Sequence, residues 1–291
     1  MKFVIRKRMF LAQGLAALLT MPCGWAASGT WGVNASGTWE LASNWLANGI
    51  ADGLDATATF SNDTVGARTV TLGSPRTLGN LAFSDSDPLT AGTWVVAGTS
   101  PLTLGVAAGA PTISVTSLTA TLAVPLAGMA FSKTGTGTLV LAGANSFTTP
   151  TLAFAEVSPG AIRVTSSAAL GGIATVSMPG TNANLSRIEL EGGVALTAKI
   201  TTAGRSDLVF LKNLSGSNAW SGDISISNSG GGYSIESAAG VLTLGGIFNG
   251  ITSARTLGLT GAGNGVAGGI IRNGNGLFGI TKTGTGNWKF T

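Results

Sequence analysis

The sequence predicts an all-β protein that folds as a right-handed parallel β-helix (a β-solenoid) with a Trp-rich N-terminal cap, after a cleaved signal peptide. Three observations predict this class. Short runs of alternating apolar and polar residues recur between clusters of Gly, Asn, Ser and Pro, no stretch after Ala26 has a convincing helical apolar period, and a short motif returns late in the chain. Because no helix-length segment separates the expected strands, βαβ architectures are disfavoured, which leaves a sandwich, a barrel or a solenoid.

The composition excludes several kinds of chemistry. The chain has 291 residues, of which 45 are Gly, only 10% are charged and none is His. Without His, a Ser-His-Asp triad and a His-ligated zinc site are excluded. The high apolar content and low charge differ from those of disordered chains. We therefore expect a folded, non-enzymatic scaffold with no catalytic, cofactor-binding or metal-binding residues.

The first element is residues 1–26, which have the pattern of a secretory signal peptide. Basic residues from Lys2 to Arg8 precede an apolar stretch, Met9–Met21, that is too short to span a bilayer. The small residues Gly24 and Ala26 predict cleavage after Ala26. Lipidation at Cys23 is disfavoured, because Thr20–Pro22 lacks the leucine and small residues that such a site usually carries. The sequence therefore predicts a secreted or cell-surface protein.

Removal of residues 1–26 changes the charge balance. The whole chain has 16 Lys and Arg against 12 Asp and Glu, but four of the bases and none of the acids precede Ala27. The mature chain is then near neutral, so the sequence pI of about 9.6 gives no support for binding to nucleic acid. The single Cys is removed as well, so stability must come from burial and strand hydrogen bonds rather than disulfides.

The second element is a Trp-rich cap segment at residues 27–63. Trp31, Trp39 and Trp45 lie in it, and Trp94 follows in the next stretch. Large aromatic side chains cover the open end of a solenoid well, so we expect these residues to be buried. The alternative is a carbohydrate-binding role, in which exposed indole faces stack on sugars.

The third element is the β-helix itself, expected over residues 64–291 with coils of about 20 residues. Thr, Val, Ile and Leu fit the pleated surface of its short strands, and Gly provides positive φ at the turns. The clearest strand patterns are Thr138–Leu141, Ile188–Leu190, Ile224–Ser227, Val241–Leu244 and Leu257–Thr260.

An internal repeat favours the solenoid over the other β architectures. The motif Lys133-Thr-Gly-Thr-Gly137 returns as Lys282-Thr-Gly-Thr-Gly286, each time after an apolar residue and a hydroxyl residue. Degenerate short repeats are typical of solenoids, because each coil must stack on its neighbours to bury its apolar face.

The segment Phe131–Thr148 resembles the autotransporter-associated β-strand repeat, whose pattern is Lys-x-Gly-x-Gly-x-Leu-x-Leu-x-Gly-x-Asn followed by an aromatic residue and Thr. The likeness is clearest over 131–171, where Val157–Val164 is similar to the second strand of the repeat and Ala168–Gly171 to its closing Ala-Leu-Gly. Residues 280–291 form a partial copy. The resemblance implies a passenger-type protein of the bacterial cell surface.

Two departures from the repeat pattern stand out. Thr149-Pro150-Thr151 replaces the usual Gly-Gly-Thr, and the second copy reaches Thr291 in the middle of a repeat. We therefore expect a fragment, a truncated reading frame or a partner that completes the coil, because an unfinished coil exposes strand edges. The outer-membrane barrel of an autotransporter is not expected in this chain.

Other candidate motifs receive structural interpretations. Gly263–Gly268 and Gly274–Gly279 fit G-x-G-x-x-G, but neither opens a helix, so we interpret both as β-helix turns. Glu189 and Glu191 share one face of a strand, which we expect to be solvated, with a carboxylate pair for polysaccharide cleavage as the alternative.

Asp85-Ser-Asp87-Pro88 has the composition of a turn, with a calcium site as the alternative, and Asp52 with Asp55 is the other acidic cluster. The glycosylation-type sequences are interpreted as turn and ladder asparagines; they start at Asn34, Asn62, Asn184 and Asn213.

The sequence thus predicts an exported, non-enzymatic β-helical passenger or scaffold, an adhesin-like surface element whose partners are a surface polysaccharide or the surface of a host or neighbouring cell. The alternative is a polysaccharide-binding or polysaccharide-active β-helix protein. An enzyme needs acidic and basic residues that converge on one face of the solenoid, and a binding module needs exposed, coplanar indoles.

Overall fold

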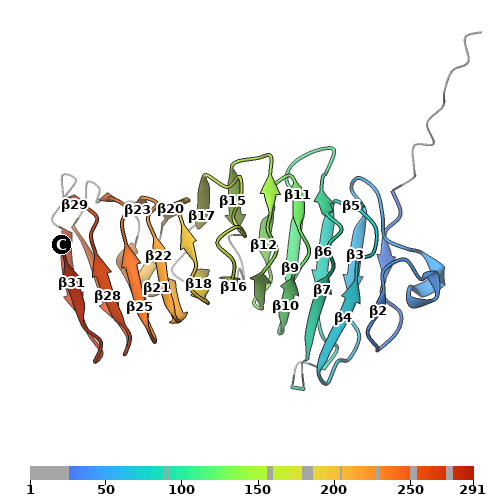
Figure 1. Cartoon of the computed structure of the whole chain (residues 1–291), viewed down its shortest axis with the longest axis horizontal. Helices are drawn as coiled ribbons and strands as arrows, with labels where there is room; N and C mark the ends of the chain where they lie inside the picture. The colour runs from blue at the N-terminus through green and yellow to red at the C-terminus, as the bar shows by residue number, and fades with distance from the viewer. Residues whose placement is uncertain are drawn as a thin grey trace, which may run out of the picture.

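The computed structural model describes residues 26–87, 89–90, 92–155, 160–178, 186–203, 205–226, 230–249, 254–272 and 278–291. Residues 1–25, which hold nearly all of the predicted signal peptide, lie outside the described residues. The chain winds into a parallel β-solenoid whose coils stack along the long axis of the molecule (Figure 1). No helix in the described part of the chain is long and apolar enough to cross a membrane.

Two long sheets of 11 parallel strands each run along the solenoid. The first, sheet 1, contains in spatial order β1 (Gly29–Thr30), β3 (Thr57–Phe60), β6 (Asn80–Phe83), β9 (Thr112–Val115), β12 (Ser132–Thr134), β15 (Thr151–Phe154), β17 (Thr175–Met178), β20 (Lys199–Thr202), β23 (Ile224–Ile226), β26 (Phe248–Asn249) and β29 (Ile271–Arg272). The second, sheet 2, contains β2 (Gly37–Thr38), β4 (Ala67–Thr71), β7 (Thr93–Ala97), β10 (Thr119–Leu122), β13 (Thr138–Leu141), β16 (Ala161–Val164), β18 (Arg187–Glu191), β21 (Arg205–Ser215), β24 (Gly230–Ser237), β27 (Arg255–Thr260) and β30 (Phe278–Lys282).

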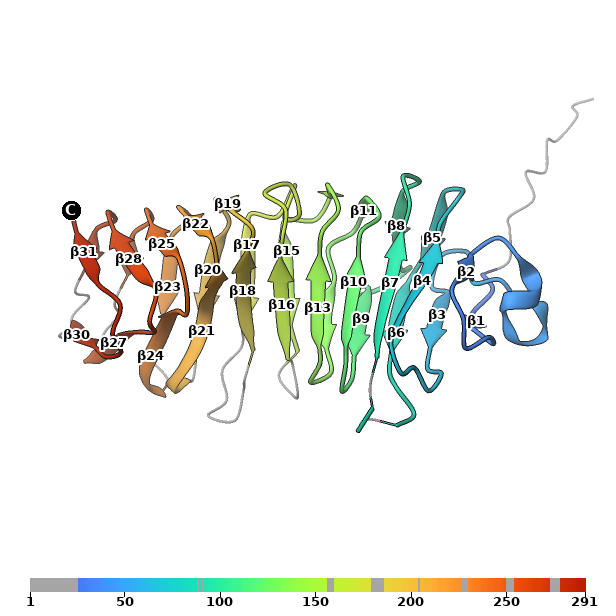
Figure 2. The same cartoon turned by 60° about the horizontal axis from the view of Figure 1, so that its bottom comes forward.

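The third side of the solenoid is divided between two shorter sheets. Sheet 3 contains β5 (Arg76–Leu78), β8 (Leu102–Leu104), β11 (Leu126–Gly128) and β14 (Ser146–Phe147). Sheet 4 contains β19 (Ala195–Leu196), β22 (Ser217–Trp220), β25 (Val241–Leu244), β28 (Asn264–Ala267) and β31 (Trp288–Phe290). Both occupy the same place in the coil, after a sheet 2 strand and before a sheet 1 strand. Figure 2 shows the strands in succession along the axis.

The register gives the length of each coil, because paired residues on neighbouring strands are one coil apart. In the C-terminal half, Ile200 pairs with Ile224, Ile224 with Phe248, and Gly265 with Trp288. These coils are longer than the expected length of about 20 residues, and so are several in the N-terminal half, where Ala67 pairs with Thr93 and Asn80 with Thr112. The expected coil length is therefore wrong for most of the solenoid. The coil that joins Thr119 to Thr138 is shorter and close to the expected length.

The core follows from the alternation of side chains along each strand. In β25, buried Leu242 and Leu244 alternate with partly exposed Val241 and Thr243. The five predicted strand patterns are confirmed at β13, β18, β23, β25 and β27. Not every strand is short: β21 has 11 residues and its register shifts against β24, whereas the strands of sheet 3 have two or three.

The repeated Lys-Thr-Gly-Thr-Gly motif forms a corner of the coil. In the first copy it connects β12 of sheet 1 to β13 of sheet 2, and in the second it connects β30 of sheet 2 to β31 of sheet 4. Gly135 has φ 76°, and a Cβ at this position would lie 2.3 Å from the carbonyl oxygen of Val115. The motif therefore encodes a turn between two sides rather than a whole coil, so its two copies need not lie on the same side.

The N-terminal end of the solenoid is closed by the predicted Trp-rich cap. Trp31, Trp39 and Trp45 are at most 2% exposed, and their rings meet around Phe60 with centroid distances between 4.9 and 6.1 Å. Two 3-10 turns, η1 (Ala42–Asn44) and η2 (Leu46–Asn48), lie at this end (Figure 1). Within residues 27–63, β1 and β2 already pair with β3 and β4 of the two long sheets.

Candidate functional site

The outer face of sheet 2 carries a row of charged side chains, here named the charge ladder. Arg163, Glu189, Lys212 and Glu236 occupy paired positions on four consecutive strands, so positive and negative residues alternate along the axis. The Nζ of Lys212 lies 3.0 Å from a carboxylate oxygen of Glu236. Arg187 and Glu191 flank Glu189 on β18. On β18, Ile188 and Leu190 face the core, and because side chains alternate along a strand, Arg187, Glu189 and Glu191 between and beside them point outward.

Glu189 is held from two sides. One carboxylate oxygen lies 2.9 Å from Nε and from Nη2 of Arg163, and the other lies 2.7 Å from Nε of Arg187. Its side chain is 3% exposed, so the prediction that Glu189 lies on a solvated face is wrong: the side chain points outward, but the two arginines cover it. Both carboxylate oxygens of Glu189 are thus engaged by guanidinium groups in charge-assisted hydrogen bonds.

Glu191 differs from Glu189 in its surroundings. It is the partly exposed member of the pair, with a side-chain exposure of 42%, and its nearest guanidinium atom is Nη1 of Arg163 at 3.6 Å. The two carboxylates share one strand face, as predicted, but Arg163 bridges them. Their arrangement is that of a structural ion-pair cluster.

Other carboxylates tie neighbouring loops and coils together. Asp52, Asp55 and Asp223 each accept a backbone N–H bond from another coil, from Thr77, Ala107 and Ile247 respectively, at 2.8–3.0 Å. Glu40 accepts hydrogen bonds from the backbone of Gly73 and from the backbone and hydroxyl of Ser74. Burial raises the pKa of Glu40, but these bonds outweigh it and hold the pKa below its usual value.

Asp85 and Asp87 build the predicted turn. Asp85 accepts bonds from the backbone of Asp87, and Asp87 from the backbone of Leu89. Asp85 also accepts hydrogen bonds from the backbone amide and the hydroxyl of Thr64, at 3.1 and 2.7 Å. Burial raises the pKa of Asp85, but these donors outweigh it and lower the pKa overall. Among the described residues, no group of three or more His, Cys, Asp or Glu is placed to hold a metal ion.

Lys133 is the fully buried charged residue of the first repeat motif. It points into the solenoid, is 0% exposed, and donates from Nζ to the carbonyl oxygens of Thr134 at 2.7 Å and Gly135 at 2.8 Å. Burial lowers the pKa of Lys133 to about 7. The side chain therefore caps the carbonyls of its own turn.

The four tryptophans singled out in the sequence, Trp31, Trp39, Trp45 and Trp94, do not form a sugar-stacking surface. Trp94, which lies on β7, is 0% exposed and packs 5.3 Å from Phe60, and the three cap indoles are similarly buried. Each cap indole also donates its N–H to a backbone carbonyl, as in the 2.7 Å bond from Trp45 to Trp39. These four side chains are therefore core residues.

The remaining sequence candidates also have structural roles. Asn213 is 0% exposed and donates to the carbonyl oxygen of Ala239 at 2.6 Å, and Asn34 bonds to Arg68 and Asp63, as ladder and turn residues do. Asn184 lies outside the described residues.

The two G-x-G-x-x-G matches contain no described turn that could cradle a phosphate. The prediction that Gly263–Gly268 forms a turn is wrong, because the centre of this segment forms β28. A Cβ at Gly265 would lie 2.4 Å from the ring of Trp288, so glycine makes room for that indole. Most of the second match, residues 274–277, lies outside the described residues.

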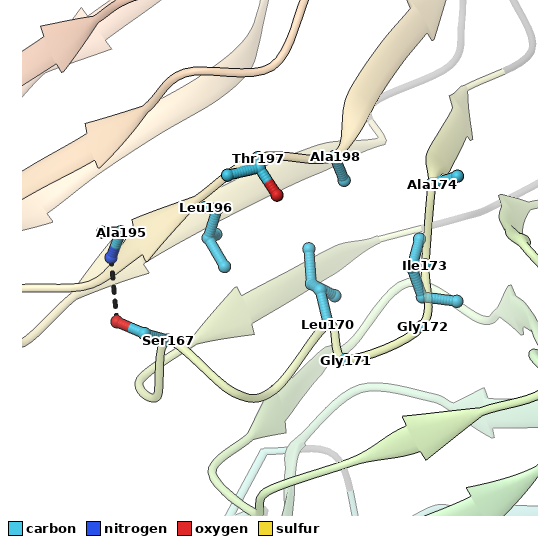
Figure 3. Close-up of a pocket in the computed structure, with 10 residues that line it drawn as sticks. All are labelled: Ser167, Leu170, Gly171, Gly172, Ile173, Ala174, Ala195, Leu196, Thr197 and Ala198. Atoms are coloured by element: carbon cyan, nitrogen blue, oxygen red, sulfur yellow. Dashed lines mark hydrogen bonds between the residues drawn. The ribbon is translucent and has the colours of Figure 1, made fainter.

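A cavity of about 270 Å³ interrupts the third side (Figure 3). The coil between β14 and β19 has turns at residues 166–172 in place of a strand, and Leu170 and Leu196 lie across the gap. The amide of Ala195 donates to the hydroxyl of Ser167 at 2.9 Å at one end. The lining consists of backbone, aliphatic and hydroxyl groups, which provide no acid, base or nucleophile pair.

A second cavity lies beside the charge ladder. Its volume is about 410 Å³, and it is lined by Arg187, Leu208, Val209, Lys212 and Glu236. Sequence reasoning missed this place, because it depends on the pairing of strands that lie a full coil apart in the chain. A ligand with both polar and apolar groups fits such a lining.

No known protein family, curated protein or solved structure matches this chain.

Proposed function

We propose that this chain is an exported, non-enzymatic β-helical scaffold of the autotransporter-passenger type and acts as an adhesin-like element at the cell surface. The observation that carries the proposal is the use of the described carboxylates: Asp52, Asp55 and Asp223 tie coil to coil, and Glu189 is clamped by two arginines. Carboxylates that bond neighbouring coils together make the solenoid rigid, which suits a spacer that presents its surface to a partner.

The predicted leader and the repeat support the export part of the proposal. Residues 1–26 have the composition of a signal peptide, and Phe131–Thr148 has the repeat pattern of passenger proteins. A solenoid of stacked coils gives a long surface for contact with a cell or a polysaccharide.

Expression of the full chain in a Gram-negative bacterium tests the export part. We expect a product that begins at Ala27, lies outside the cytoplasm and is accessible to added protease. The variant Leu15→Arg, which places a charge in the apolar stretch, should stay in the cytoplasm as a control. Retention of Met1 on the unaltered chain would contradict the proposal.

A binding assay tests the adhesin part. Beads coated with the purified chain should adhere to bacterial or host cells, and incubation with polysaccharides should release no shortened products. Release of products that is abolished by Glu191→Gln would instead support the polysaccharide-active alternative.

The cavity beside the charge ladder favours polysaccharide binding as a second candidate function. Arg187 and Lys212 can bond to acidic sugars, and Leu208 and Val209 provide an apolar floor. A glycan array tests this candidate: binding should weaken in Lys212→Ala and persist in Lys199→Ala, a matched lysine on the exposed start of β20.

A further inference from the structure

The outer face of sheet 1 differs in composition from that of sheet 2. On β3, β6, β9, β12, β15 and β17, buried residues alternate with residues that point outward. The outward-facing residues of these strands, here named the hydroxyl face, are small and uncharged: Thr57, Thr59, Asn80, Ala82, Thr112, Ser114, Ser132, Thr134, Thr151, Ala153, Thr175 and Ser177.

The hydroxyl face contains no charged and no aromatic side chain. Lys133, the charged residue of these strands, points into the core, whereas the outer face of sheet 2 carries the charge ladder. A charged ligand would find no ion-pair partner on the hydroxyl face. A sugar would find no ring on which to stack. The ligand that fits is therefore uncharged and is bound through hydroxyl and methyl groups.

The residues of the hydroxyl face form continuous rows along the axis, because these strands pair without a shift in register. The first row runs through Thr57, Asn80, Thr112, Ser132, Ala153 and Ser177. The hydroxyl of Thr112 donates to Oδ1 of Asn80 at 2.7 Å, and Nδ2 of Asn80 donates to the hydroxyl of Thr57 at 3.4 Å. A second row, from Thr59 to Thr134, lies beside the first. These side chains are thus ordered before a ligand binds.

The rows have two characteristic spacings. Neighbouring strands lie about 4.8 Å apart, and outward-facing residues of one strand are separated by about 6.7 Å. The oxygen atoms of hexagonal ice repeat at distances close to these along the a and c axes of the crystal. Hydroxyl groups at the positions of the hydroxyl face can therefore bond to consecutive water molecules of one crystal plane.

The regular part of the face ends after β17. On β20, the exposed Lys199 pairs with Thr175 and introduces a charge. A hollow of about 310 Å³ lies beside Ser177 and Thr201. A flat crystal plane cannot follow the hollow and does not solvate the charge, so contact is confined to the strands from β3 to β17.

We propose that the hydroxyl face binds the surface of ice. A single bond from a hydroxyl group to water gains little free energy, because the group is already hydrated, so affinity requires many aligned groups that act together. A bound molecule prevents the ice front from advancing over it, which lowers the temperature at which the crystal grows. Ice binding is a further activity of the solenoid and does not depend on adhesion to cells.

Thermal hysteresis, the gap between the melting and the growth temperature of an ice crystal, tests the proposal on the purified chain. We expect a measurable gap and faceted crystals with the unaltered protein. Thr112→Lys, which puts a long charged side chain into the first row, should lose both effects. Thr121→Lys, a matched change on the outer face of β10 in sheet 2, should keep them. Circular dichroism establishes that each variant is folded. No gap with the unaltered protein, or equal loss in both variants, would overturn the proposal.

A gain of activity tests the rows independently of stability. Ala153 interrupts the first row, so Ala153→Thr should widen the gap by adding a hydroxyl group. Ala97→Thr, on the outer face of β7 in sheet 2, should leave the gap unchanged. An unchanged gap in Ala153→Thr would contradict the assignment. Binding to crystalline cellulose that Thr112→Lys weakens, without any effect on ice, would assign the face to a neutral polysaccharide and overturn the proposal.

Discussion

At the scale of single residues, Lys133 shows how burial and hydrogen bonding act together. Its ammonium group caps two carbonyl oxygens of its own turn but has no exposed surface. Burial lowers the pKa of Lys133 from 10.5 to about 7. The unfolded chain therefore binds more protons than the folded chain between these two values, and folding stability rises with pH across that window.

The Lys133→Met variant checks this coupling. We expect the free energy of unfolding of the unaltered protein to increase from about pH 6.5 to about pH 9.5, and the variant to lose that increase. Lys282→Met is the matched control, since it removes the same motif residue from an exposed position. Denaturant unfolding at the two pH values measures the effect, and a slope retained in Lys133→Met would contradict the assignment.

Glu189 predicts a second effect at this scale. Glu189→Gln should lower stability by about 2 kcal/mol, because two arginines lose a charged acceptor in a covered position. Glu191→Gln, whose carboxylate is 42% exposed, should cost less than about 1 kcal/mol. Urea unfolding of both variants gives the comparison, and equal losses would show that the two arginines do not clamp Glu189 as described.

At the scale of elements, the corners of the coil depend on glycine for two separable reasons. Gly172 has φ 85°, and a Cβ there would lie 2.1 Å from the carbonyl oxygen of Phe147. Gly109 has a similar φ of 80° but open space around it. A residue with a Cβ would have a strained backbone at either position, but only at Gly172 would its Cβ also clash with a neighbouring coil.

The substitutions Gly172→Ala and Gly109→Ala therefore separate strain from contact between coils. Gly109→Ala should cost about 1 kcal/mol from the left-handed backbone alone. Gly172→Ala should cost clearly more, because the backbone of two coils must move apart. Thermal unfolding followed by circular dichroism provides the test, and similar losses in both variants would indicate that the coils can yield at this corner.

The elements were predicted from sequence where the information is local. The strand at Val241–Leu244 was predicted from the alternation of inward- and outward-facing side chains, and it forms β25. The burial of the three cap tryptophans was predicted from their size and their place near the start of the solenoid. The side of the solenoid on which a repeat lies could not be predicted, because the Lys-Thr-Gly-Thr-Gly motif specifies only a corner. The burial of Glu189 was missed for a related reason: its cover comes from Arg163, which is brought alongside by the register of two coils.

At the scale of the whole molecule, the solenoid is a stack whose joints are not equal. Most neighbouring coils are joined by strand pairs on all three sides, but the coil with turns at 166–172 has no strand on the third side and therefore lacks a third pair both with β14 and with β19. Towards β14, the carbonyl oxygens of Ala168 and Gly171 still accept backbone bonds from Asn145 and Phe147. The amide of Ala195 and the hydroxyl of Ser167 bridge that side beside the cavity of Figure 3. The two long sheets hold the joint, through pairs such as Val176 with Ile200.

This joint has a mechanical consequence for the adhesin-like role that we propose. Because the hydrogen bonds between coils run along the axis, tension on the two ends loads every joint in series. The joint between the coil with turns at 166–172 and the coil of β19 has two strand pairs, and on its third side the bond from Ala195 to Ser167, so we expect it to bear the highest force per bond. Stretching of single molecules should therefore show a first rupture that divides the stack there. A Ser167→Cys, Ala195→Cys disulfide should raise that force, whereas an unchanged first rupture would place the weakest joint elsewhere. The joint beside the interrupted side should therefore separate first, and the coils on either side of it should stay folded at that force.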